Sequence, residues 1–178
     1  MKLAKKSKRV AYGAVFTALI TVILIGGALI DTLDMSLSVI ASAFICIGVI
    51  EFGAPFALTV WAASSCLSLI LFPLNTAGWM FLIFCGWYPV FKRGVEIIHY
   101  VAAWAVKLSA FNVSCFVFWF ITVKLLNIPF DVGFAGLIWI FAVVLNVAFV
   151  LCDLAATRLI TLYMFRWRSR LGFKDVIK

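Results

Sequence analysis

Long apolar runs separated by short polar turns make up most of the chain. A transmembrane helix needs about 20 largely apolar residues, or about 17 when it crosses without tilt. Runs that approach or exceed this length occupy residues 10–30, 35–50, 55–72, 106–126 and 133–154, and a shorter run occupies residues 77–91. The pattern predicts an all-α, polytopic membrane protein with six transmembrane helices.

Turn-forming residues separate most of these runs. Asp31 and Asp34 lie in the first turn, Pro73 begins the turn at residues 73–76, and Pro129 lies in the turn at residues 127–131. Pro55 suits the first turn of the third helix, where a missing N–H would have no helical partner.

The apolar stretch at residues 94–127 is too long for a single crossing. As a helix it would extend about 50 Å, whereas the hydrocarbon core is about 30 Å thick. We expect residues 94–105 to lie on the cytoplasmic surface and residues 106–126 to cross the bilayer. The alternative is a helix that enters the bilayer at Gly94. The last helix is also overlong, and residues 153–163 are expected to continue into the cytoplasmic headgroup layer.

Charge is concentrated at the two ends of the chain. Basic residues crowd positions 1–9 and 166–178, and Lys92 and Arg93 form an interior pair. Cytoplasmic segments carry an excess of Lys and Arg, so six crossings with both termini cytoplasmic agree with this distribution. We divide the chain into a basic N-terminus (1–9), a transmembrane domain (10–165) and a basic tail (166–178), and expect a multi-pass protein of the cell membrane.

Composition supports this class. Apolar residues make up 66% of the chain, whereas they make up roughly half of a soluble domain. The net charge of +8 lies mainly at the flanks, where it favours anionic lipid headgroups over nucleic acid.

Recognisable catalytic and metal-binding motifs are absent from the sequence. The five cysteines contain no Cys-x-x-Cys pair, and no phosphate-binding loop or His-Glu-x-x-His motif occurs. Asp31 and Asp34 are one turn apart without a third ligand, and His99 beside Glu96 has no further catalytic partner. We therefore predict a protein that is not an enzyme and holds no cofactor or metal.

Small residues follow one face of the first helix. Ala14 and Ala18 are separated by three residues, and such spacing lets another helix approach closely. The neighbouring helix can belong to the same chain or to a partner.

This pattern, on the first of six helices after a basic N-terminus, resembles the substrate-binding S components of energy-coupling-factor vitamin transporters. The resemblance implies that Ala14 and Ala18 contact a coupling membrane subunit that works with separate ATPases. It also implies capture of a small molecule from outside, near the outer ends of the helices.

Aromatic and amide groups near those outer ends are candidates for substrate binding. Stacking walls with a few polar groups suit planar ligands. The alternatives are an interfacial aromatic belt for the tryptophans and a helix-to-helix hydrogen bond for the deeper amide. The candidates are Asn75, Trp79, Trp119, Trp139 and Asn146.

Polar residues also gather near the inner end. Lys92, Arg93 and Glu96 are candidates for docking a partner. The spacing of Glu96, His99, Tyr100, Ala103 and Lys107 predicts one helical face directed to water and headgroups.

A deeper position for Lys107 would require a carboxylate partner, because an unpaired charge in the bilayer costs at least about 3 kcal/mol. Glu51, Glu96 and Asp153 are the available partners, and Asn112 is expected to be buried in either case.

Two main functional hypotheses follow. The first is a membrane subunit for small-molecule uptake that depends on a separate energising module. The alternative is a non-transporting scaffold or accessory protein that docks a partner at the turn of residues 92–96. A third hypothesis is an enzyme acting on lipid-linked substrates.

Overall fold

The computed structural model describes residues 2–30, 33–97, 99–125 and 138–167. Its regular elements are all helical, which confirms the all-α prediction for this part of the chain. The elements are α1 (Lys2–Leu29), α2 (Asp34–Phe52), α3 (Ala54–Leu71), α4 (Thr76–Met80), η2 (Phe81–Cys85), α5 (Tyr88–Val95), α6 (Tyr100–Phe120), η3 (Ile121–Leu125), α7 (Ile138–Leu162) and η5 (Tyr163–Trp167), where η denotes a π-helical segment.

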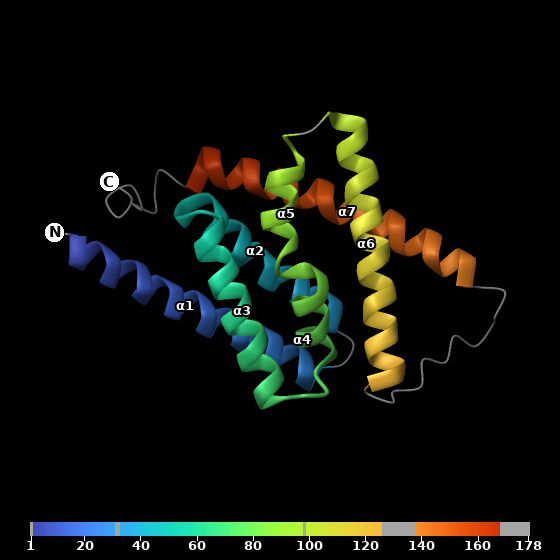
Figure 1. Ribbon diagram of the computed structural model, residues 1–178, viewed down its shortest axis with the longest axis horizontal. Helices are drawn as coiled ribbons and strands as arrows, with labels where there is room; N and C mark the ends of the chain where they lie inside the picture. The colour runs from blue at the N-terminus through green and yellow to red at the C-terminus, as the bar shows by residue number, and fades with distance from the viewer. Residues whose placement is uncertain (1, 31–32, 98, 126–137, 168–178) are drawn as a thin grey trace.

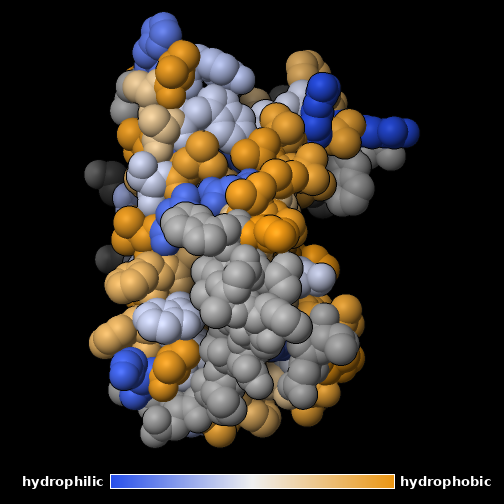
Figure 2. All heavy atoms as spheres, turned by 90° about the vertical axis from the view of Figure 1, so that its right-hand side faces the viewer, coloured by the Kyte–Doolittle hydropathy of each residue, from blue (hydrophilic) through white to orange (hydrophobic). Residues whose placement is uncertain are grey.

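Long apolar helices dominate the described residues. Five of them have the length and composition to cross a membrane: Ser7–Leu29, Asp34–Phe52, Ala54–Leu71, Tyr100–Lys124 and Ile140–Arg166. Figure 2 shows hydrophobic side chains over much of one face of the molecule. Exposed apolar residues on α6 and α7 include Val113, Phe116 and Val143. A surface of this kind suits lipid, which confirms the prediction of a membrane protein with several apolar helices.

The segment predicted as a short fourth helix is broken into α4, η2 and α5, which follow one another through the structure (Figure 1). The break falls before Pro89, which lies in the first turn of α5 and lacks a backbone N–H. Gly86 donates its N–H to the carbonyl of Phe81 at 2.8 Å, a hydrogen bond over five residues that closes a wide π-helical turn.

Helices α1 to α3 and the broken segment pack around one apolar core. Small residues such as Ala41, Ala57 and Ala77 alternate there with large side chains such as Ile20 and Phe81, all of them essentially inaccessible. A second apolar cluster connects α5, α6 and α7 through Tyr88, Phe111 and Phe149. The rings of Phe111 and Phe149 stack with centroids 4.5 Å apart.

The structure gives the helix boundaries in this region and corrects one expectation, the continuous polar face of residues 96–107. Helix α6 begins at Tyr100, so residues 100–105, which were expected to lie on the cytoplasmic surface, belong to the same helix as the residues expected to cross the bilayer. Glu96 follows α5 and His99 precedes α6, so the predicted polar face does not lie on one continuous helix. Helix α7 runs through Asp153 to Leu162, in agreement with a last helix that continues past residue 153.

Gly86 provides the close approach between α3 and the broken segment. An added Cβ at Gly86 would collide with the indole of Trp61, whereas one at Gly94 would meet nothing within 4 Å. We expect Gly86→Ala to lower the free energy of unfolding by about 1–3 kcal/mol, as overpacking does in other cores.

Gly94→Ala is the matched control, because it makes the same substitution at an open position and should change stability little. Reversible unfolding in mixed micelles, followed by tryptophan fluorescence, measures both effects. Equal effects of the two substitutions would contradict the packing role of Gly86.

Candidate functional site

A buried carboxylate between two lysines forms the most polar part of the described interior. Asp153 on α7 accepts hydrogen bonds from Lys92 of α5, with Nζ to Oδ1 at 2.5 Å, and from Lys107 of α6, with Nζ to Oδ2 at 3.1 Å. The exposed fractions of these residues are only 3% for Lys92, 5% for Lys107 and 3% for Asp153. One side chain thus connects three helices.

Helical spacing places two further groups beside this carboxylate. Tyr88 lies one turn before Lys92 on α5 and donates its hydroxyl to Asp153 Oδ1 at 2.6 Å. Thr157 lies one turn after Asp153 on α7, and its hydroxyl accepts a hydrogen bond from Lys92 Nζ at 2.7 Å. These two hydroxyls form hydrogen bonds with the Asp153 carboxylate and the Lys92 ammonium, which would be costly to bury in an apolar interior without partners.

Glu96 supplies a second carboxylate at the end of α5. Its Oε1 lies 3.3 Å from Lys107 Nζ and 3.6 Å from Lys92 Nζ. The Glu96 side chain is 49% exposed, unlike the buried carboxylate of Asp153. The ammonium of Lys107 also lies 5.3 Å from the ring centroid of Trp104, within the range of a cation–π contact.

We call these six residues, Tyr88, Lys92, Glu96, Lys107, Asp153 and Thr157, the Asp153 cluster. Its two ammonium groups and two carboxylates have balanced formal charge. Buried ion pairs contribute little net stability, but the loss of one partner leaves an uncompensated charge and is strongly destabilising. The cluster therefore determines how α7 sits against α5 and α6.

Polar contacts accompany α7 along the same face. Asn112 and Asn146 exchange two side-chain hydrogen bonds between α6 and α7, at 3.0 and 3.2 Å. Farther along, the hydroxyl of Tyr163 donates to Glu51 of α2 at 3.3 Å. Asn146, a candidate for substrate binding, thus makes the helix-to-helix hydrogen bond that was the alternative to that role.

The inner-end predictions have mixed outcomes. The required partner of Lys107 is present, because both Glu96 and Asp153 pair with it. Lys92 is buried and directed to Asp153, so its side chain is not available at a docking surface. Arg93 is exposed and donates to the carbonyl of Val49 at 3.3 Å.

Asn112 departs from its prediction. It was expected to be buried, but its side chain is exposed on α6 apart from its hydrogen bonds to Asn146 and the carbonyl of Leu108.

Asn75 acts as a helix cap at the opposite end of the structure. Its Oδ1 accepts the N–H of Gly78 at 3.2 Å, and its Nδ2 donates to the carbonyl of Leu24 at 2.9 Å and to Ser68 Oγ at 3.2 Å. All of these partners belong to the chain itself, so the amide has a structural role between α1, α3 and α4.

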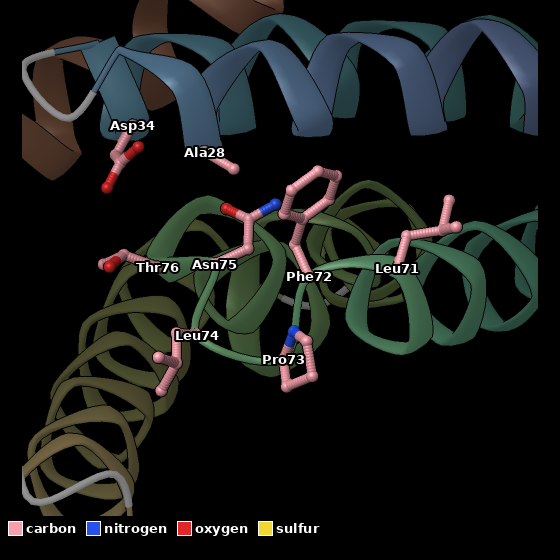
Figure 3. Close-up of a pocket in the computed structure, with 8 residues that line it drawn as sticks. All are labelled: Ala28, Asp34, Leu71, Phe72, Pro73, Leu74, Asn75 and Thr76. Atoms are coloured by element: carbon pink, nitrogen blue, oxygen red, sulfur yellow. The ribbon is translucent and has the colours of Figure 1, made fainter.

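A pocket of about 340 Å³ lies beside this cap (Figure 3). Its lining combines the carboxylate of Asp34 and the side chains of Asn75 and Thr76 with apolar groups of residues 71–74 and Ala28. The volume is at the lower end of the range for small-molecule sites.

The other predicted outer-end residues do not line this pocket. Trp79 donates its indole N–H to the carbonyl of Pro73 at 2.8 Å, and Trp119 is exposed on α6. The side chain of Trp139 lies outside the described residues. Of the four candidates for substrate binding whose side chains the structure describes, only Asn75 lies at the pocket.

Tyr88 and Thr157 were missed by the sequence reading. Each is four residues from a charged member of the cluster, in Tyr88-x-x-x-Lys92 and Asp153-x-x-x-Thr157. Residues four apart lie on the same face of a helix, so each of these side chains lies beside its charged neighbour. This spacing is the sequence signal from which the two residues could have been predicted. Within the described residues, no group of three or more His, Cys, Asp or Glu side chains is arranged to hold a metal ion.

Comparisons with protein-family models, with curated proteins and with solved structures found no significant match to this chain.

Replacing the shared carboxylate tests the role of the cluster. Asp153→Asn leaves two buried ammonium groups facing a neutral side chain, and we expect it to lower the free energy of unfolding by about 3 kcal/mol or more. Lys107→Met should cost much less, because the pair between Lys92 and Asp153 keeps its charge balance.

Unfolding in mixed micelles gives both values, and the double variant completes the cycle. Lys107→Met should recover part of the loss caused by Asp153→Asn. A strictly additive cycle, or a larger loss for Lys107→Met than for Asp153→Asn, would contradict the proposed charge balance.

Proposed function

We propose that the chain is the membrane-embedded, substrate-binding subunit of a small-molecule uptake system, and that it works with a separate coupling membrane subunit and ATPases. The observation that carries this proposal is the outward position of Ala14 and Ala18 on α1. Both side chains are exposed, whereas Phe16, Ile20 and Leu24 of the same helix are buried in the core.

An outward small-residue face suits a partner helix better than internal packing. Without a hydrophobic effect between helices in lipid, close approach of backbones supplies much of the association energy. Ala11 extends the exposed small face toward the N-terminus, and Val15 and Leu19 flank it with larger exposed side chains. The arrangement supports α1 as the contact with the coupling subunit that the resemblance to S components implies.

The pocket beside Asn75 is the candidate for substrate capture. It combines one carboxylate, one hydroxyl and the aromatic ring of Phe72. It lies where α4 begins, whereas Lys92 of the Asp153 cluster lies on α5, farther along the broken segment. A small ligand carrying a cationic or hydrogen-bond-donating group would suit Asp34 and Thr76. Asn75 then shapes the pocket by capping α4, while the ligand contacts its neighbours.

We propose six crossings, with both termini cytoplasmic. The broken segment of α4, η2 and α5 supplies the crossing additional to the five long helices. Arg9 of α1 donates to the carbonyl of Phe52, and Tyr163 after α7 contacts Glu51. These contacts bring the beginning of α1 and the end of α7 to the same end of α2, as an even number of crossings requires.

Fewer residues support the scaffold hypothesis than were expected. With Lys92 buried, Arg93 and the half-exposed Glu96 remain as groups near the inner turn that a partner can reach. Within this alternative, a partner would contact the turn without requiring transport.

An uptake assay with altered α1 surfaces tests the main proposal. Ala14→Leu with Ala18→Leu should abolish copurification with the coupling subunit and accumulation of a radiolabelled vitamin in cells that also express the ATPases, because bulk at these positions separates the helices. Ala62→Leu with Ala63→Leu, which adds the same bulk to exposed positions of α3, is the matched control.

The purified α1 variant should still bind the vitamin, as measured by tryptophan fluorescence, since the pocket lies elsewhere. Absence of binding by the unaltered chain across a panel of vitamins and their precursors, together with no association with a coupling subunit, would refute the uptake function.

The topology has an independent test. A cysteine at Thr32 should react with a membrane-impermeant maleimide added to intact cells, and a reporter fused after Lys178 should read as cytoplasmic. Labelling of the Thr32→Cys variant only after the cells are permeabilised would overturn the assigned orientation.

A further inference from the structure

The buried part of the Asp153 cluster has an excess of positive charge. Lys92, Lys107 and Asp153 are each at least nine-tenths buried, so two cations face one carboxylate in the protected interior. The compensating charge belongs to Glu96, whose side chain is 49% exposed. An excess buried charge is costly in an apolar environment, so this position requires an anion.

The contacts of Glu96 are weaker than those of Asp153. Its Oε1 lies 3.3 Å from Lys107 Nζ and 3.6 Å from Lys92 Nζ, whereas Asp153 approaches the two ammonium groups to 3.1 and 2.5 Å. Charge-assisted hydrogen bonds of good geometry have distances of about 2.7–2.9 Å. Glu96 therefore balances the charge without occupying the best position for either lysine.

The position held by Glu96 is accessible from the end of the helices. Glu96 comes directly after the last residue of α5, and the next residue, Ile97, is 87% exposed. Rotation of the Glu96 side chain toward solvent would uncover the Lys107 ammonium without moving a helix. A ligand can reach this place without passing through the apolar core.

From these observations we propose that Lys92 and Lys107 form an oxyanion-binding site in which the Glu96 carboxylate is a displaceable internal ligand. The ligand is a phosphate group, either free in solution or carried by a lipid headgroup. Its oxygens accept hydrogen bonds from Lys107, whose ammonium Glu96 would have left. Lys92 attracts the phosphate by its charge alone, because its three N–H groups continue to donate to Asp153 and Thr157. This inference does not depend on the uptake function.

Replacing the internal ligand tests the proposal. The full chain is placed in phosphatidylcholine nanodiscs and titrated with inorganic phosphate, with sodium chloride at equal ionic strength as the control for screening. Bound anion raises the midpoint of thermal unfolding in proportion to occupancy, which gives an apparent Kd. Glu96→Gln keeps the size of the side chain but removes its charge, so its phosphate Kd should be about tenfold lower than that of the unaltered chain.

Two further variants locate the site. Lys107→Met in combination with Glu96→Gln should remove the gained phosphate response, because the remaining Lys92 and Asp153 balance each other. Arg93→Gln removes a neighbouring exposed cation that contacts Val49 instead, and should leave the phosphate response of the unaltered chain unchanged.

Nanodiscs containing phosphatidic acid distinguish the two sources of phosphate. If the lipid headgroup binds, the Glu96→Gln variant should be stabilised without added phosphate and should lose its response to the free anion. A response to free phosphate alone, unaffected by phosphatidic acid, would identify a soluble ligand. Either result supports the site.

The proposal is overturned if Glu96→Gln binds phosphate no better than the unaltered chain, or if its response persists after Lys107→Met or is equalled by chloride. If the Glu96→Gln variant does not fold, the proposal is tested on the unaltered chain. Its weaker phosphate response must be lost in the single variant Lys107→Met, and a response that does not depend on Lys107 overturns the proposal.

Discussion

Neutralisation of charge in an apolar interior is the constraint on which the second half of the structure depends. Lys92 on α5 and Lys107 on α6 can remain buried because Asp153 of α7 lies between them. Helix α7 comes much later in the chain than α5 and α6, and each of the three would carry an unpaired charge without the others. The adjoining aromatic cluster of Tyr88, Phe111 and Phe149 adds contact area to the same interface.

The class of the protein and part of the site could be predicted from the sequence. An apolar run that is long enough indicates a membrane-crossing helix, however the helices then pack. The all-helical architecture could therefore be predicted from the lengths of the runs. The need of Lys107 for a carboxylate followed from the cost of a buried charge, and Glu96 and Asp153 were among the candidate partners.

The rest depended on helical phase and tertiary packing. Lys92 and Arg93 are adjacent and equally typical of a cytoplasmic flank, yet only Lys92 turns inward. Neighbouring residues on a helix point about 100° apart, so the way α5 packs decides which of the two faces Asp153, and local sequence does not specify that packing. The amide of Asn75 could in principle bind a ligand, but it forms hydrogen bonds to Leu24 and Ser68 and so has a structural role.

The single acidic residue within α7 has a consequence for biogenesis. On insertion scales, an aspartate near the centre of a transmembrane helix opposes entry into the bilayer by about 3 kcal/mol. Asp153 recovers stability only when its lysine partners on the earlier helices, Lys92 above all, are in position. Helix α7 would therefore insert poorly into the bilayer until α5 and α6 are present. Its insertion becomes a late step that depends on earlier segments of the same polypeptide.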